Sequence, residues 1–203
     1  TKRNNLFLRV SKGHFATNHS HINYYIDVTT QKTRLSEAQA VAEELVSYYS
    51  TSTVVDTILC LDGTQVIGTC LANELTKGNF VSVNAHQTIY VLTPEHTSGS
   101  QLIFRDSLLS AINGKHVLIL AVSVASGSTA KAAIEAVKYY GGEVSGVASI
   151  FATVANCGGY TVNSVFNPND LEGYFAVPAH ECPLCKAGEK IDALVNCHGC
   201  SKL

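Results

Sequence analysis

The sequence is poor in charged residues and has no long apolar run. Charged residues make up 15% of the 203 residues, and hydrophobic residues make up 46%. No run comes near the ~18 consecutive apolar residues that a membrane-spanning helix needs. The net charge is −2, and the Lys and Arg residues are scattered along the chain. We therefore expect a globular protein with an apolar interior that binds neither a membrane nor nucleic acid.

Methionine is absent, and cysteine is present in an odd number, seven. Because there is no methionine, we expect that the first residue is not the translated start, and a removed leader stays open. Four of the cysteines form two Cys-x-x-Cys pairs near the end of the chain. Such usage suits a reducing compartment better than a disulfide framework. The expected location is the cytoplasm.

Strand-like and helix-like patterns alternate from about residue 35 to residue 155. Short apolar runs predict strands at residues 54–61, 80–83, 88–92, 117–122 and 144–154. Apolar residues at helical spacing predict helices that begin near Ser36, Val66 and Thr129. Short connections between parallel strands require right-handed crossovers. The predicted fold class is α/β, a doubly wound and mainly parallel sheet flanked by helices.

Both ends of the chain differ from this pattern. Residues 6–10 and 22–28 are short β-branched or aromatic runs, which predict two strands at an edge of the domain. After about residue 155 the alternation is lost. We therefore predict one α/β domain at residues 1–155, including the N-terminal strands of residues 1–34, and a small Cys-rich appendage at residues 156–203.

Residues 116–141 predict a phosphate-binding element. The apolar run 117–122 is followed by the small residues of 123–129, and a helix begins at Thr129. A turn of this kind places backbone N–H groups at the positive end of a helix, at the carboxyl edge of the sheet. Gly127 permits a positive φ, and the hydroxyl groups of Ser126, Ser128 and Thr129 can donate to phosphate oxygens.

Two common nucleotide sites do not fit this turn. It lacks the lysine of a Walker loop and the G-x-G-x-x-G of a dinucleotide site. The alternative is a strand-to-helix turn whose small residues serve packing alone.

Four segments carry a resemblance to a known family. Residues 117–129 fit a phosphoribosyl-pyrophosphate motif, residues 20–27 (SHINYYID) fit an S-x-x-x-Y-Y-I-D segment, Asp62-Gly63 fits a pyrophosphate loop, and residues 182–186 (CPLCK) fit a C-terminal segment. The chain thus resembles type I phosphoribosyltransferases, in particular orotate phosphoribosyltransferase-like proteins, over nearly its whole length.

The resemblance implies transfer of a 5-phosphoribosyl group from phosphoribosyl pyrophosphate to a pyrimidine-like base. The residues implied in substrate binding are Ser123, Ala125, Ser126, Gly127, Ser128, Thr129, Asp62, Gly63 and Tyr25. Asp27 and Arg105 are the candidate catalytic residues. Mg²⁺ would be chelated mainly by substrate phosphates and water. A homodimer is expected because a symmetric dimer is the commonest form of soluble homo-oligomers.

Two departures from the family pattern bear on catalysis. The family has two acidic residues, which stabilise the positively charged sugar of the transition state, where this chain has Ala121 and Val122. The loop of residues 93–104 contains no Lys or Arg to neutralise the departing pyrophosphate, and Arg105 is the first cation after it. Two hypotheses therefore stand: an active transferase, and a non-catalytic protein that senses a phosphorylated ribose or nucleotide.

The two cysteine pairs have the spacing of a zinc ribbon. Cys182, Cys185, Cys197 and Cys200 could close a tetrahedral site with four thiolates, so zinc here would be structural. A redox pair, free thiols, or replacement of one sulfur by His180 or His198 are the alternatives.

Histidines and tyrosines crowd the N-terminal strands. His14, His19 and His21 could contact a metal or a phosphate, although such residues more often lie on the surface or satisfy hydrogen bonds. Tyr24 and Tyr25 could stack on a base, although an aromatic pair in a strand more often serves packing.

Overall fold

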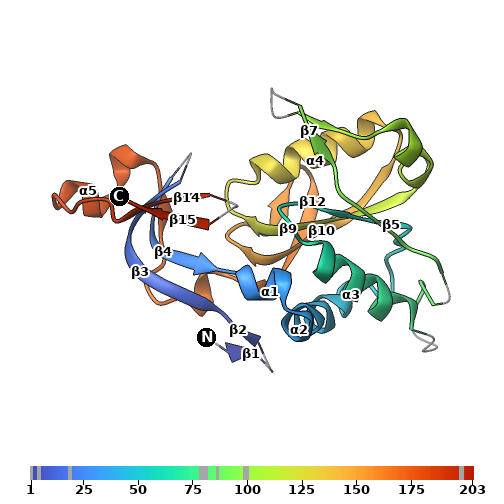
Figure 1. The fold of residues 1–203 in the computed structure, drawn as a ribbon, viewed down its shortest axis with the longest axis horizontal. Helices are drawn as coiled ribbons and strands as arrows, with labels where there is room; N and C mark the ends of the chain where they lie inside the picture. The colour runs from blue at the N-terminus through green and yellow to red at the C-terminus, as the bar shows by residue number, and fades with distance from the viewer. Residues whose placement is uncertain are drawn as a thin grey trace.

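The computed structural model describes residues 2–3, 6–17, 20–77, 82–85, 87–97, 101–196 and 199–203. Figure 1 shows two parts. One is a twisted sheet with helices on both sides, and the other is a smaller sheet that carries the C-terminus, which we call the hood.

The larger sheet has six strands in the order β11-β12-β10-β9-β5-β6. Its strands are β5 (Thr57–Cys60), β6 (Tyr90–Leu92), β9 (His116–Val124), β10 (Glu143–Ala152), β11 (Asn156–Cys157) and β12 (Tyr160–Phe166). The pairs from β12 to β6 are all parallel, and only the edge strand β11 is antiparallel to its neighbour. The predicted doubly wound, mainly parallel α/β fold is confirmed.

Helices cover both faces of this sheet. Figure 1 shows α4 (Ser128–Tyr139) on one side and α1 (Thr29–Thr33), α2 (Leu35–Val46) and α3 (Gln65–Thr76) on the other. Successive residues of β9 serve the two layers in turn, because side chains alternate across a strand. Leu118 and Leu120 belong to the cluster of α2 and α3, whereas Val117 and Ile119 belong to the cluster of α4.

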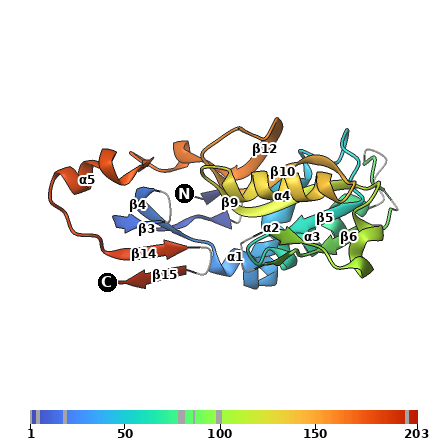
Figure 2. The ribbon, with the colours of Figure 1, turned by 90° about the horizontal axis from the view of Figure 1, so that it is seen from above.

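The hood is a five-stranded sheet built from both ends of the chain. Its order is β13-β4-β3-β14-β15, with bounds β3 (Arg9–Ala16), β4 (His21–Asp27), β13 (Ala176–Val177), β14 (Ala193–Asn196) and β15 (Gly199–Lys202). Figure 2 shows β14 and β15 beside β3 and β4. The N-terminal strands are thus completed by C-terminal strands.

The predicted domain boundary after residue 155 needs correction. Strand β12 lies beyond that residue, yet it pairs with β10 and extends the larger sheet as far as Phe166. The Thr and Asn residues of this strand hide its apolar alternation in the sequence. The segment that leaves the larger sheet therefore begins after β12, and its last strands join the hood.

The remaining elements are short. They are β1 (Lys2–Arg3), β2 (Leu6–Phe7), β7 (Glu95–His96), β8 (Leu102–Ile103), α5 (Pro183–Lys186) and the 3-10 helices Asp106–Ala111, Pro168–Asp170 and Ala179–Glu181. No helix in the described part of the chain is long and apolar enough to cross a membrane.

Two local predictions differ from the structure. The helix expected to be capped by Ser36 begins at Leu35 and has Arg34 as its N-cap residue, because α1 ends at Thr33 and leads directly into it. Of the strand expected at residues 80–83, only Ser82 and Val83 are among the described residues, and neither lies in a strand.

Candidate functional site

The turn between β9 and α4 has the features of an anion-binding site. Strand β9 ends at Val124, and α4 begins at Ser128. The side chains of Ser123, Ser126 and Thr129 are exposed beside this turn. The first N–H groups of a helix have no partner within it, and the helix dipole makes that end positive. The first turn of α4 contains no acidic residue that would repel an anion.

Gly127 gives this turn its shape. Its φ is +77°, in the left-handed region that glycine adopts without strain. A Cβ at this position would lie 2.8 Å from Cys157 Sγ. The turn is also held from the neighbouring strand, because the Thr153 hydroxyl donates to the Ala125 carbonyl at 3.0 Å. The backbone therefore reaches its curved conformation only with glycine here.

A cavity of about 370 Å³ lies over the turn, between the larger sheet and the hood. Residues 122–130 line one side of it, and hood residues such as Thr17, Tyr25 and Val195 line the other. The structure thus brings Tyr25 to the same cavity as the predicted phosphate-binding residues. The volume suits a small organic ligand.

The Asp62-Gly63 turn at the end of β5 also lines the cavity through Asp62. Both residues have positive φ, +54° and +83°. Positive φ is rare in a residue other than glycine, and such strained turns cluster at ligand sites. Thr64 stabilises the turn, since its hydroxyl donates to the carbonyl of Leu61 at 2.8 Å.

Lys32 is a cavity residue that sequence reasoning missed. It lies on α1, and its Nζ donates to the Asp62 carbonyl at 3.0 Å. A Cβ on Gly63 would lie 3.8 Å from the same Nζ. Among the described residues that line the cavity, Lys32 supplies the one ammonium group and Asp62 the one carboxylate. No motif marks Lys32, because its helix has only five residues.

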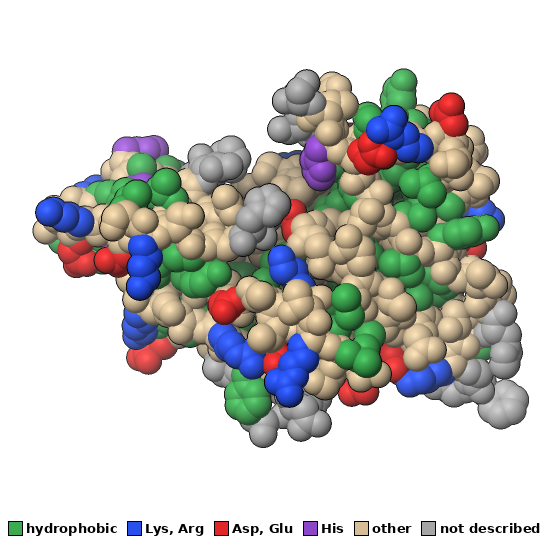
Figure 3. Space-filling model, in the orientation of Figure 1, with side chains coloured by type: hydrophobic (Ala, Val, Ile, Leu, Met, Phe, Trp, Pro, Cys, Tyr) green, Lys and Arg blue, Asp and Glu red, His purple; other side chains and the backbone are tan. Residues whose placement is uncertain are grey.

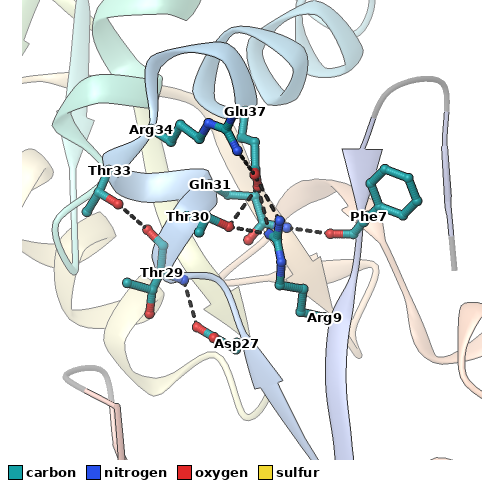
Figure 4. Close-up of polar contacts among 9 residues, drawn as sticks. All are labelled: Phe7, Arg9, Asp27, Thr29, Thr30, Gln31, Thr33, Arg34 and Glu37. Carbon is teal, nitrogen blue, oxygen red and sulfur yellow. Dashed lines mark hydrogen bonds and ion pairs between the residues drawn. The ribbon is translucent and has the colours of Figure 1, made fainter.

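A polar network fixes α1 and therefore Lys32 (Figure 4). The Arg9 guanidinium donates to both carboxylate oxygens of Glu37, at 2.8 and 2.9 Å, and also to the Thr30 hydroxyl. Thr30 in turn donates to Glu37 at 2.7 Å. The Gln31 amide donates to the Phe7 carbonyl at 2.8 Å. The hood strands, α1 and α2 are thus joined at one point.

Arg34, beside this network, and Arg105, on another part of the surface, also lie near acidic side chains. On the face shown in Figure 3, the Lys and Arg side chains lie in small separate groups near Asp and Glu side chains. Arg34 lies 3.7 Å from Glu37, and Arg105 forms an ion pair with Glu95.

Neither candidate catalytic residue is among the described residues that line the cavity, but Asp27 is next to two of them in the chain. Asp27 immediately precedes Val28 and Thr29, which line it. The Thr29 hydroxyl and N–H donate to Asp27 and lower the pKa of its carboxyl. Arg105 is not among the described lining residues, and it is held by Glu95 on the β7–β8 side of the molecule.

Aromatic side chains form the apolar wall of the cavity. The rings of Phe151 and Tyr174 lie 5.4 Å apart, edge to face. Burial raises the pKa of Tyr174 to about 12 and also raises the pKa of Tyr25. Both phenols are therefore neutral at physiological pH and can donate hydrogen bonds.

Comparison with known proteins shows a likeness in structure. No family model and no curated protein sequence matches the chain. The orotate phosphoribosyltransferase of Mycobacterium tuberculosis, solved with inorganic phosphate, matches with a TM-score of 0.52 and 18% identity, over 73% of this chain and 80% of that chain. Leishmania donovani UMP synthase matches with a TM-score of 0.58 and 20% identity, over 80% of this chain and 34% of its own. The fold is that of a type I phosphoribosyltransferase.

Adenine enzymes share the same phosphoribosyltransferase fold. The adenine phosphoribosyltransferase of Thermoanaerobacter pseudethanolicus matches with a TM-score of 0.51 and 18% identity, over 71% of this chain and 88% of that chain. The fold therefore does not distinguish between classes of base.

Ala121 and Val122, where the resemblance to the family predicts an acidic pair, are both apolar. Ala121 is buried at 1% exposure, and Val122 lines the cavity just before the turn between β9 and α4. The cavity wall next to this turn thus carries a hydrocarbon side chain.

The predicted metal ligands separate into two sets. Cys182 and Cys185 lie together with His14 and His21, and the four donor atoms are all within 4.8 Å of one another. Cys200 is exposed on β15 and is not a member of this group, while Cys197 lies outside the described residues. Sequence spacing pointed to the first cysteine pair but not to its histidine partners.

Proposed function

We propose that this protein binds 5-phosphoribosyl 1-pyrophosphate and transfers its phosphoribosyl group to a pyrimidine-like base. The observation that carries the proposal is the glycine-shaped turn of residues 123–129 at the start of α4, which opens into the cavity under the hood. The structure of the orotate phosphoribosyltransferase of Mycobacterium tuberculosis, which has a similar fold, contains inorganic phosphate, and this is consistent with an anion site on this fold.

Each part of the ligand has a matching surface in the cavity. The 5-phosphate would accept hydrogen bonds from the amides and hydroxyls of Ser126, Ser128 and Thr129. The pyrophosphate would lie at the Asp62-Gly63 turn, where Lys32 supplies positive charge. The base would pack against the hood near Tyr25.

In this reaction a ring nitrogen of the base loses its proton to solvent and forms a bond to C1 of the ribose, as the C1–O bond to pyrophosphate breaks and pyrophosphate leaves. Positive charge develops on the sugar, and negative charge develops on the leaving group. Asp27 is the proposed carboxylate that stabilises the positive charge on the sugar, since its lowered pKa keeps it ionised. Arg105 would assist the leaving group only after its pair with Glu95 breaks.

A magnesium ion would fit the cavity by its chemistry. Hard cations prefer oxygen ligands, and substrate phosphates, water and the Asp62 carboxylate supply them. Bound Mg²⁺ would neutralise charge on the pyrophosphate.

The apolar side chains at positions 121 and 122 favour a second candidate function. With Ala121 and Val122 in place of the acidic pair, the cavity has less negative charge to stabilise the sugar cation. Removal of one such contact typically costs ~3–4 kcal/mol of barrier. The second candidate is therefore a regulatory protein that senses a phosphorylated ribose or nucleotide without turning it over.

Pyrophosphate release, measured with phosphoribosyl pyrophosphate, Mg²⁺ and orotate, uracil, hypoxanthine or adenine in turn, tests the proposal. Turnover that is fastest with a pyrimidine supports it. Tight binding of phosphoribosyl pyrophosphate by calorimetry without turnover of any base supports the sensor. Absence of both binding and turnover contradicts both candidates.

Three further properties belong to the proposal. The described cysteines are free thiols, which is consistent with a cytoplasmic protein. We also propose a homodimer, because a symmetric dimer is the commonest form of soluble homo-oligomers. A structural zinc ion is argued separately below.

A further inference from the structure

Four metal-ligating side chains meet at one end of the hood. His14 lies on β3, His21 opens β4, Cys182 immediately precedes the short helix α5, and Cys185 lies within it. His14 Nε2 lies 3.0 Å from His21 Nδ1 and 3.5 Å from the sulfur of each cysteine. Cys185 Sγ lies 3.2 Å from His21 Nδ1. Four donor atoms from three segments thus point at a common centre.

These separations are close to those of ligands around a tetrahedral zinc ion. Zinc binds sulfur at about 2.3 Å and imidazole nitrogen at about 2.0–2.1 Å, so tetrahedral ligands lie about 3.3–3.8 Å apart. The spread of all four donor atoms, within 4.8 Å, needs only small adjustments to accept the ion. Two thiolates with two imidazoles form a common structural zinc site.

The histidine ring of His14 is held in the orientation that metal binding needs. Its Nδ1 lies 3.0 Å from the Glu189 carbonyl, to which it can donate a proton. That hydrogen bond leaves Nε2, the atom that faces the cysteines, with its lone pair available. The backbone N–H of His14 also donates to Asp192 at 2.7 Å, so the strand itself is fixed against the same C-terminal segment.

The segment that carries the two cysteines, residues 172–192, has almost no buried side chains to hold it in place. His14, His21 and Cys182 are 2%, 8% and 0% exposed. In residues 172–192, all of which are described, Cys182 is the one buried side chain. A segment with so little apolar burial gains little stability from a core, and a metal commonly replaces the core in such cases.

We propose that His14 Nε2, His21 Nδ1, Cys182 Sγ and Cys185 Sγ bind one structural Zn²⁺ ion. The ion joins the β3–β4 hairpin to a segment more than a hundred residues away in the chain. Thr17 and Ser20 of the same hairpin line the cavity, and so do Ala176 and Val195 of the C-terminal strands. Zinc therefore fixes the hood that covers the ligand site. All four positions are filled by protein, so the ion has no catalytic role.

Metal analysis of the full chain, purified without chelators, tests the site. We expect about one zinc per chain in the wild type. The Cys182→Ser and His21→Ala variants should lose it, whereas His21→Cys, which keeps a ligand, should retain it. The Cys200→Ser and His180→Ala variants are matched controls from nearby residues outside the cluster, and both should retain one zinc.

Cobalt substitution supplies a spectroscopic readout that does not depend on activity. Co²⁺ in a tetrahedral site with two thiolates gives ligand-field and sulfur-to-metal absorption bands, which should disappear in Cys185→Ser and persist in Cys200→Ser. Loss of zinc in Cys200→Ser with retention in His21→Ala would overturn the ligand set. A wild-type chain that binds neither zinc nor cobalt would overturn the site.

Discussion

Arg9 of β3 and Glu37 of α2 form a bidentate ion pair that joins the hood to the helices of the larger sheet. The guanidinium nitrogens lie 2.8 and 2.9 Å from the two carboxylate oxygens. Thr30 of α1 donates to the same carboxylate. Since α1 carries Lys32 into the cavity, the pair links the folding of the hood to the geometry of the ligand site.

The Glu37→Gln variant should lose stability in a pH-dependent way. Hydrogen bonds from Arg9 are the main reason why the pKa of Glu37 falls from 4.5 to about 2. A carboxyl whose folded-state pKa is lowered stabilises the fold above its ordinary pKa, and this contribution disappears as the pH falls towards 2. We expect a loss of roughly 1 kcal/mol at pH 7, because Arg9 is partly solvated.

Urea unfolding at several pH values between 7 and about 2 measures this effect. The variant should show a flatter pH dependence between about 4.5 and 2 than the wild type. Glu43→Gln, at an exposed position of the same helix, is the matched control and should behave as the wild type. Equal losses in both variants would refute the role of the pair.

The Lys32→Met variant should bind phosphoribosyl pyrophosphate about tenfold more weakly, because one charge-assisted contact contributes about 1.4 kcal/mol. Its Nζ donates to the Asp62 carbonyl at the turn proposed for the pyrophosphate, whereas the 5-phosphate is proposed to bind at the other turn, at Ser126, Ser128 and Thr129. Binding of ribose 5-phosphate should therefore change less than twofold. Calorimetry with both ligands measures the difference. Lys115→Met, next to the amino end of β9, is the control, and equal weakening of both ligands would contradict the assignment.

The turn between β9 and α4 could be predicted because its parts are contiguous. The buried strand, the small residues and the helix start all occur within residues 116–141, and the structure places them as the pattern indicates. The parallel sheet could also be predicted, since strand and helix patterns alternate in that region.

The other site residues depend on contacts between distant segments. Lys32 reaches the cavity from a five-residue helix, which is too short to show a helical period. Cys182 meets His14 from a position 168 residues away. Spacing within one segment predicted a partnership of Cys182 and Cys185 with Cys197 and Cys200, because local spacing carries no information on a hairpin at the opposite end of the chain.

The Gly127→Ala variant should lose anion binding. An alanine at φ +77° is strained, and its Cβ would lie 2.8 Å from Cys157 Sγ, so the turn must move. We expect at least tenfold weaker binding of ribose 5-phosphate by calorimetry. Gly159→Ala is a matched control, because its φ is +88° and a Cβ there meets nothing within 4 Å. Unchanged affinity in Gly127→Ala would indicate that the turn serves packing alone.

The Val122→Asp variant tests whether the missing carboxylate limits turnover. Val122 is partly exposed and lines the cavity beside the turn between β9 and α4, so an aspartate there can face a ligand in the cavity. Negative charge next to a developing sugar cation lowers the barrier by up to ~3–4 kcal/mol, and partial solvation in an unadapted site reduces that gain. We expect kcat for pyrophosphate release to rise at least tenfold. Val122→Asn has nearly the same shape without the charge and should not raise kcat. An equal rise in kcat in both variants would assign the effect to the polarity of the side chain. No rise in kcat in either variant would show that the apolar side chain of Val122 does not limit the reaction.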